Sequence, residues 1–270
     1  MIPKLYNRIR KAGRCLTGLS VMAWLLVSCS YIPESERLIP VLPASVNRNV
    51  LIEDFTGQRC MNCPTASDII EGLVREYGEE TVVPVAIHSG PLGFVTNERF
   101  KGLKTVTGDE YFARWESDHQ PVGMIDRKGL TDYPVWGAKV YEELQKPSTV
   151  DIAVSAHVTD SGLDVAADVT SLDGEVNGRL QLWVVEDSVT AFQMMPDGTR
   201  KDDYVHRHVF RAAVNGTWGE DISVRKGETV SRRHEGFILD DEWNKGRMYV
   251  VAFVYDESGV LQVVRKNLSH

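Results

Sequence analysis

The sequence predicts an α/β domain over residues 49–147, followed by an all-β domain over residues 148–270. In the first part, strand-like and helix-like runs alternate, as they do in α/β domains. The second part consists of short strand signals separated by Gly, Asp and Asn, and seven or eight short strands in about 120 residues are typical of an immunoglobulin-like β-sandwich. Each part is long enough to bury a core of its own.

The first three elements of the α/β part have clear local signals. A strand is expected at residues 50–55, which form a nearly continuous apolar run. A helix begins near Pro64, continues with apolar residues at helical spacing, and ends at Gly78. A second strand covers residues 82–87, and Pro84 within it favours an edge position because proline cannot donate to a sheet ladder.

The later elements follow from the same patterns. A short helix is expected around residues 111–115, a strand entered through Pro121, and a helix over residues 133–144. Two Asp/Glu-Ser-Gly turns, at 160–162 and 257–259, indicate hairpins. The strands of the second part are expected near 150–158, 163–172, 179–187, 205–213, 222–226, 229–239, 247–256 and 260–267.

The N-terminus has the features of an export signal. Basic residues precede an apolar run at 16–27, which is shorter than the ~20 residues that a membrane span requires. The run ends in Leu-Val-Ser followed by Cys29, which resembles the lipobox of bacterial lipoproteins; the alternative is an ordinary signal peptide with a chance cysteine. The resemblance implies that residues 1–28 are a signal peptide and that Cys29 carries a covalent lipid. Residues 29–48 contain three prolines, which predict an extended tether.

Composition restricts the possible partners. The net charge of −8 disfavours nucleic acid as a partner and favours solubility of the folded part. No second long apolar run is present in the sequence, so the expected membrane contact is through the lipid anchor alone.

A C-x-x-C pair lies between the first expected strand and the first expected helix. Unpaired N–H groups at a helix start lower a thiol pKa from about 8.5 to roughly 3.5–7.5. Cys60 is therefore the expected nucleophile and Cys63 the resolving thiol, with Arg59 adding positive potential. Two other interpretations stay open, namely a structural disulfide in an oxidising compartment and a metal site.

Histidines could assist this pair. His88 ends the strand at 82–87 and could shuttle protons, act as a third ligand beside two thiolates, or be a polar loop residue. The sequence His206-Arg207-His208 would place two imidazoles on one face of a strand, but no acidic third ligand is identifiable. We therefore assign no metal site, and the only non-protein group expected is the lipid on Cys29.

The region around the cysteines resembles thioredoxin-fold proteins, which carry a strand, an Asp-Phe pair, four residues and then C-x-x-C. Residues 54–60 have this spacing. The resemblance implies that Asp54 is a buried acid that moves the proton of the resolving cysteine. It also implies a cis-proline at Pro121, facing the pair and presenting backbone groups to a bound chain.

The chain as a whole resembles an outer-membrane lipoprotein family of Bacteroidetes in which a thioredoxin-like domain is joined to a β-sandwich. Residues 55–64, 121–127 and 204–211 carry this resemblance. It implies an outer-membrane lipoprotein that faces the periplasm or the cell surface. Two functions are consistent with it: thiol–disulfide exchange on envelope proteins, or non-catalytic binding or adhesion by a lipoprotein with a structural disulfide.

Overall fold

The computed structural model describes residues 48–269. In this range 46% of the residues lie in strands and 18% in helices. The predicted signal peptide at 1–28, Cys29 and nearly all of the predicted tether lie outside the described residues.

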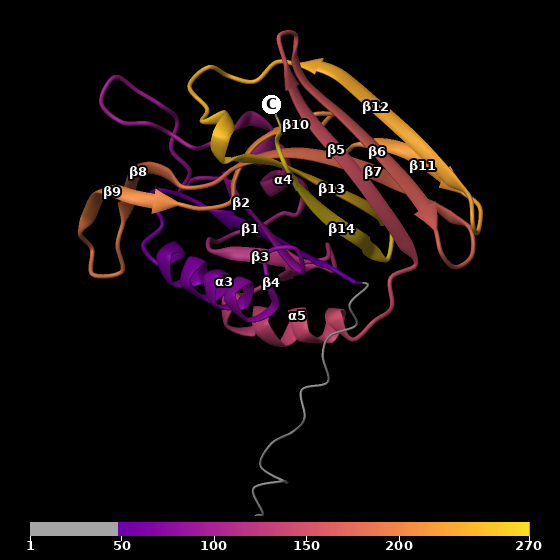
Figure 1. Ribbon diagram of the computed structural model, residues 1–270. Helices are drawn as coiled ribbons and strands as arrows, with labels where there is room; N and C mark the ends of the chain where they lie inside the picture. Colours follow the sequence, from indigo (N-terminus) through magenta and orange to yellow (C-terminus); the bar gives the residue numbers. More distant parts are fainter. Residues whose placement is uncertain (1–47, 270) are drawn as a thin grey trace, which may run out of the picture. The chain divides into compact units, whose positions relative to one another are not determined.

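The elements follow one another as shown in Figure 1. The helices are α3 (Cys63–Tyr77), α4 (Val106–Arg114) and α5 (Trp136–Leu144), with 3-10 turns η1 (Tyr133–Val135) and η2 (Lys245–Arg247). The strands are β1 (Val50–Thr56), β2 (Val82–His88), β3 (Val122–Ile125), β4 (Leu130–Thr131), β5 (Val150–Thr159), β6 (Gly162–Ser171), β7 (Val176–Glu186), β8 (Val189–Met194), β9 (Arg200–His206), β10 (Val209–Ala213), β11 (Glu220–Val224), β12 (Thr229–Phe237), β13 (Met248–Asp256) and β14 (Gly259–Asn267).

A nine-stranded mixed sheet forms the centre of the described chain. Its order is β14-β13-β7-β10-β2-β1-β3-β4, with β11 paired to β7. The pairs β1–β2 and β2–β10 are parallel, and the other pairs are antiparallel. A three-stranded sheet, β12-β6-β5, and the hairpin β8-β9 complete the strands.

Helices α3 and α5 lie together on one face of the β1–β3 region (Figure 1). Their apolar side chains, among them Leu73, Trp136 and Val140, pack against Val50 and Ile52 of β1. The helix α3 ends where predicted, at Gly78, whose N–H donates to the Val74 carbonyl. These local elements confirm the helical periodicity and the glycine stop that the sequence indicates.

The expected fold class, an α/β thioredoxin-like domain joined to an all-β immunoglobulin-like sandwich, is wrong. The chain is mostly β, and its large mixed sheet contains β1 and β2 together with β7, β10 and β13. One apolar core joins these strands, because Leu51 and Val83 belong to the same buried cluster as Trp183, Phe210 and Phe253. The domain boundary that we expect after residue 147 stays a prediction.

The position of β2 explains why the sheet is continuous. We expect β2 at an edge because of Pro84, but β10 pairs with it through Val209 and Ala86, and the Ala86 N–H donates to the His208 carbonyl. Pro84 lies two residues before this contact. At Pro84, β2 pairs with β1 and not yet with β10, so the missing N–H removes no hydrogen bond to β10. The proline therefore does not prevent the pairing of β2 with β10.

Candidate functional site

Cys60 and Cys63 are joined by a disulfide where β1 leads into α3. Cys63 is the first residue of α3, and Pro64 follows it in the first helical turn. The N-terminal end of a helix has a partial positive charge, which favours a thiolate at either sulfur once the disulfide is reduced. Each cysteine is only 2% exposed, so the surroundings of the disulfide decide which molecules reach it.

Two buried glutamines hold the turn that contains Cys60. The Gln193 side-chain amide donates to the Cys60 carbonyl oxygen at 2.7 Å. The Gln58 side chain accepts from the Leu103 N–H at 2.8 Å and donates to the Phe192 carbonyl at 3.2 Å. The turn is thus fixed by β8 on one side and by the long loop before α4 on the other.

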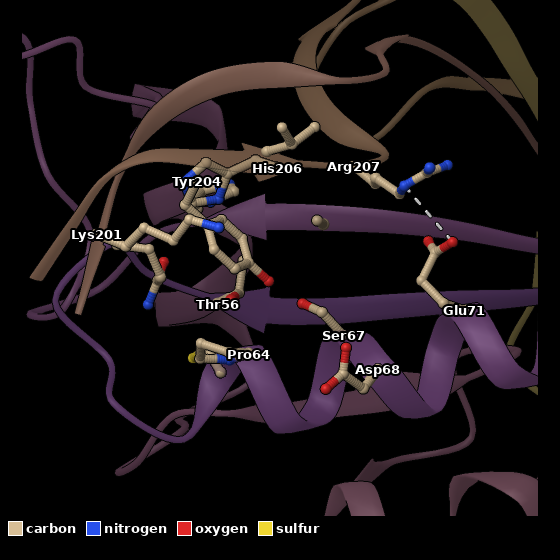
Figure 2. Close-up of a pocket in the computed structure, with 14 residues that line it drawn as sticks. Thr56, Pro64, Ser67, Asp68, Glu71, Lys201, Tyr204, His206 and Arg207 are labelled. Carbon is tan, nitrogen blue, oxygen red and sulfur yellow. Dashed lines mark hydrogen bonds and ion pairs between the residues drawn. The ribbon is translucent and has the colours of Figure 1, made fainter. Parts of the chain in front are cut away.

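A pocket of about 250 Å³ opens beside Cys63. Figure 2 shows α3 bounding it with Ser67 and Glu71, and β9 bounding it with Tyr204. Cys63 is among the described residues that line it, and Cys60 is not. The volume lies just below the range of drug-sized ligand sites, so the pocket suits one side chain or a small thiol. The other lining residues are Thr56, Pro64, Asp68, Ala86, His88, Gln193, Lys201, Val205, His206 and Arg207.

Two buried imidazoles face each other at this pocket. His88 Nε2 lies 3.2 Å from His206 Nδ1. Burial lowers the pKa of His206 to about 4. Burial, together with the nearby His206 and Arg211, holds the pKa of His88 well below its usual value. Both rings are therefore neutral at pH 7, and each neutral imidazole has one donor and one acceptor nitrogen for hydrogen bonds at the pocket.

Asp54 lies in β1 and is 1% exposed. Neither of its carboxyl oxygens has a hydrogen-bond partner among the described residues. Burial raises the pKa of Asp54 to about 8, so the carboxyl is mostly protonated at pH 7. It borders a cavity of about 20 Å³, enough for one water molecule. This cavity adjoins the pocket beside Cys63, since the two share Ser67, Glu71, Ala86 and Arg207.

Pro121 lies at the same end of the sheet as the cysteines. Its peptide bond with Gln120 is cis, as expected. Because Val122 pairs with Phe55, Pro121 falls beside Thr56, four residues before Cys60. The Gln120 side chain donates to the Thr56 carbonyl at 2.7 Å and fastens this segment to the end of β1.

Arg59 is exposed and turned toward the long loop. Its guanidinium lies 4.9 Å from the centre of the Phe94 ring, and the main-chain N–H of Arg59 donates to the Leu92 carbonyl. Gly57 allows this close approach, because a Cβ at Gly57 would lie 2.4 Å from the Leu92 carbonyl carbon.

The sequence does not point to the partners that come from β8 and β9. Gln193 and Tyr204 lie more than 100 residues after Cys60, and no local pattern distinguishes them. His206-Arg207-His208 is the one pattern in this region, but its expected geometry is wrong. β9 ends at His206 and β10 begins at Val209, so the imidazole of His206 reaches His88 while that of His208 binds Tyr249 and Glu71.

Two further properties concern residues 48–269 only. In this range no cluster of three or more His, Cys, Asp or Glu side chains could hold a metal ion. In the same range no helix has the length and apolar character needed to cross a membrane.

The comparison with protein families identifies the protein's relatives. The family model for outer membrane protein Omp28 matches residues 108–270, more than half of the chain. The chain belongs to the Omp28 family. Membership places it in the outer membrane of the cell envelope and confirms the predicted location. The lipid on Cys29 stays a prediction, because this residue precedes both the matched and the described residues.

Solved structures share the fold of this Omp28-family protein. HBP35 of Porphyromonas gingivalis has a TM-score of 0.64 and 15% identity, covering 83% of this chain and 76% of that chain. A protein from Agrobacterium tumefaciens has a TM-score of 0.50 and 14% identity, covering 84% of this chain and 100% of that chain. At these identities the similarity extends to the fold alone. The comparison with curated proteins found no match.

Proposed function

We propose that this Omp28-family protein carries out thiol–disulfide exchange with proteins of the cell envelope through Cys60 and Cys63. One observation supports the proposal most strongly: the disulfide lies at the N-terminal end of α3, and Cys63, whose sulfur leaves when Cys60 is attacked, lines a pocket together with two neutral imidazoles. A disulfide that only stabilises the fold requires neither a pocket at one of its cysteines nor two neutral imidazoles beside it.

The reaction needs no further oxidant for one turnover. A substrate thiolate attacks the sulfur of Cys60, the Cys60–Cys63 bond breaks, and the Cys63 sulfur leaves as a thiolate. A second substrate thiolate then attacks the substrate sulfur of the mixed disulfide and displaces Cys60. The substrate dithiol becomes a disulfide, and the two electrons reside in the reduced pair. In reverse, Cys60 is the nucleophile and Cys63 the resolving thiol.

Neighbouring groups handle the protons and the substrate chain. Protonated Asp54 supplies a proton to the Cys63 thiolate through the water-sized cavity and Ser67, and recovers it from solvent. His88 lines the same pocket as Cys63 and offers a hydrogen bond to the sulfur that leaves. Pro121, at the same end of the sheet, presents its backbone to the bound chain, and Arg59 adds positive potential before Cys60.

The protein acts at the membrane through its N-terminus. In this proposal Cys29 carries the lipid, and the proline-containing residues 29–48 hold the folded part away from the bilayer. Its substrates are proteins of the envelope, and the reaction needs no cofactor besides the disulfide.

One observation favours a second candidate function. Both cysteines are almost completely buried, as expected for a structural disulfide in a non-catalytic binding or adhesion lipoprotein. In that function, a substrate protein would not reach either sulfur, and removal of Cys60 would leave binding unchanged.

Trapping of the mixed disulfide tests the proposed reaction. We expect Cys63→Ser, in a background with Cys15→Ser and Cys29→Ser, to form a stable mixed disulfide with glutathione when treated with glutathione disulfide, because no resolving thiol remains. Cys60→Ser in the same background should form this adduct at least about tenfold more slowly, since Cys63 is not the proposed nucleophile. Mass spectrometry of the intact protein measures both rates.

The exposed Met61, within the same turn, offers a matched control. Met61→Ala should leave the exchange of the native pair unchanged. If neither single-cysteine variant formed the adduct while both kept the native circular dichroism spectrum, the exchange proposal would be contradicted and the structural disulfide favoured.

A further inference from the structure

The described residues that line a second pocket, of about 320 Å³, are all arginine or aromatic. These residues are Arg114, Trp115, Arg127, Arg179, Trp218 and Tyr255. The pocket continues into a wider depression of about 1310 Å³ that shares five of them. No described residue lines both this pocket and the one beside Cys63, so the second pocket is a separate site.

Three buried donors of this pocket lack a hydrogen-bond acceptor among residues 48–269, and one of them is the Nε of Arg179. Arg127 is 7% exposed, and its Nε and Nη2 donate to Glu53 at 3.2 Å, whereas its Nη1 has no hydrogen-bond partner among the described residues. The indole N–H of Trp115 also has none within this range. Buried polar atoms are nearly always paired in folded proteins, with protein, water or a bound group. All three unpaired atoms are donors, so the missing partner is an acceptor.

The inner pocket has an excess of positive charge. Arg114 forms no ion pair with any described residue, and its guanidinium lies 5.3 Å from the centre of the Trp115 ring. The Nε of Arg179 lies 3.3 Å from Asp221, which is 88% exposed, and ion pairs with such exposed groups are weak. Asp221, Asp256 and Glu257 line only the wider depression. An anion entering the inner pocket would therefore meet no carboxylate among the described residues of its wall.

Aromatic rings form the remaining wall. The guanidinium of Arg127 lies 4.3 Å from the centre of the Tyr255 ring, and the Tyr255 hydroxyl donates to the Trp218 carbonyl. The faces of Tyr and Trp rings bind flat or ring-shaped groups by stacking. Guanidinium groups present parallel N–H donors that match a carboxylate.

We propose that this pocket binds an organic acid whose carboxylate is attached to a ring. The carboxylate accepts hydrogen bonds from Arg127 Nη1 and Arg179, and the ring stacks on Trp115 or Tyr255. An acidic sugar and an aromatic acid share this chemistry. The site is independent of the thiol–disulfide exchange at Cys60 and Cys63.

Isothermal titration calorimetry of the full-length protein tests this proposal with two matched pairs of probes. The pairs are D-glucuronate with D-glucuronamide and benzoate with benzamide, in which the amide keeps the ring and loses the charge. We expect at least one acid to bind about tenfold or more tightly than its amide, because charge-assisted hydrogen bonds are about twice as strong as neutral ones. Preference for glucuronate would identify an acidic sugar, and preference for benzoate an aromatic acid.

Two variants connect this binding to the pocket. Arg114→Gln, combined with Arg179→Gln, should weaken acid binding at least about tenfold. Arg225→Gln is the control, because Arg225 is exposed and does not line the pocket. If the double variant fails to fold, Arg179→Gln alone replaces it, since the ion pair that it loses is with the exposed Asp221. Trp115→Phe removes the unpaired N–H, keeps an aromatic ring, and should also weaken binding.

Three results would overturn the proposal. The first is that neither acid binds more tightly than its amide, and the second is that the folded variant with Arg114→Gln and Arg179→Gln binds the acid like the wild type. Inorganic sulfate competing as effectively as the better organic acid would show that the ring is not recognised.

Discussion

Glu53→Gln is expected to lower the free energy of unfolding by about 3–5 kcal/mol, because it leaves Arg127 as an uncompensated buried charge. Glu53 is fully buried and accepts from Arg127 Nε and Nη2 at 3.2 Å. Burial raises the pKa of Glu53, and Arg127 opposes the rise. Since arginine keeps its proton in proteins, the pair is expected to stay ionised. Urea unfolding followed by circular dichroism measures the loss.

The exposed pair Lys139–Glu142 provides a matched control. Glu142→Gln should change the free energy of unfolding by no more than about 1 kcal/mol, since exposed ion pairs contribute little. The double variant Glu53→Met with Arg127→Met should lose less free energy of unfolding than Glu53→Gln, because it removes both buried charges. Equal losses for Glu53→Gln and Glu142→Gln would contradict the importance of this buried pair.

Asp54→Asn is expected to stabilise the protein increasingly as the pH rises. The pKa of Asp54 is about 8 in the folded protein and 3.8 in its ordinary state, so the folded state binds more protons between these values. The wild type therefore loses stability from pH 4 to pH 8, whereas asparagine cannot ionise. The difference in free energy of unfolding between Asp54→Asn and the wild type should reach several kcal/mol at pH 9, since each pKa unit corresponds to about 1.4 kcal/mol.

Urea unfolding of both proteins from pH 4 to pH 9 measures this difference. His206 has the opposite dependence, because its pKa is lowered from 6.5 to about 4 on folding and its contribution to stability is lost as the pH falls through this window. His206 is present in both proteins, so its contribution cancels in the difference between them. Asp68→Asn, at the exposed rim of the pocket beside Cys63, is the matched control for replacing one aspartate by asparagine. A pH-independent difference between Asp54→Asn and wild type would show that Asp54 is ionised in the folded state.

The rate of thiol–disulfide exchange should also change in Asp54→Asn. If Asp54 supplies the proton to the Cys63 thiolate, Asp54→Asn should slow the reaction with a dithiol at pH 7 by about 10²-fold, the lower end of general acid–base effects. Asp68→Asn again serves as the control.

Local patterns predict the elements that depend on neighbouring residues. The helix over Cys63–Tyr77 and its stop at Gly78 follow from apolar spacing and a glycine cap, and the turns at 160–162 and 257–259 give the β5–β6 and β13–β14 hairpins. Arrangement of the strands could not be predicted in this way. The pairing of Val209 with Ala86 joins segments more than 100 residues apart and has no local signal.

In the candidate site, too, some residues can be predicted from local sequence patterns and others cannot. The cysteine pair and Asp54 belong to one motif of fixed spacing at β1, and Pro121 follows from its place before the strand β3, so these residues are visible in the sequence. The hairpin β8–β9 is partly hidden, because the charged start of β9 lacks alternation of apolar and polar residues. Gln193 and His206 therefore become part of the site only through tertiary contacts.

The reduction potential of the Cys60–Cys63 pair tests the proposed exchange most directly. The protein with Cys15→Ser and Cys29→Ser can be equilibrated in dithiothreitol or glutathione buffers of known potential, and its free thiols counted by alkylation and mass spectrometry. The proposed exchange predicts a value between about −270 and −120 mV, as in known oxidoreductases. A value below about −300 mV, together with resistance of the native pair to glutathione, would contradict it and identify a structural disulfide.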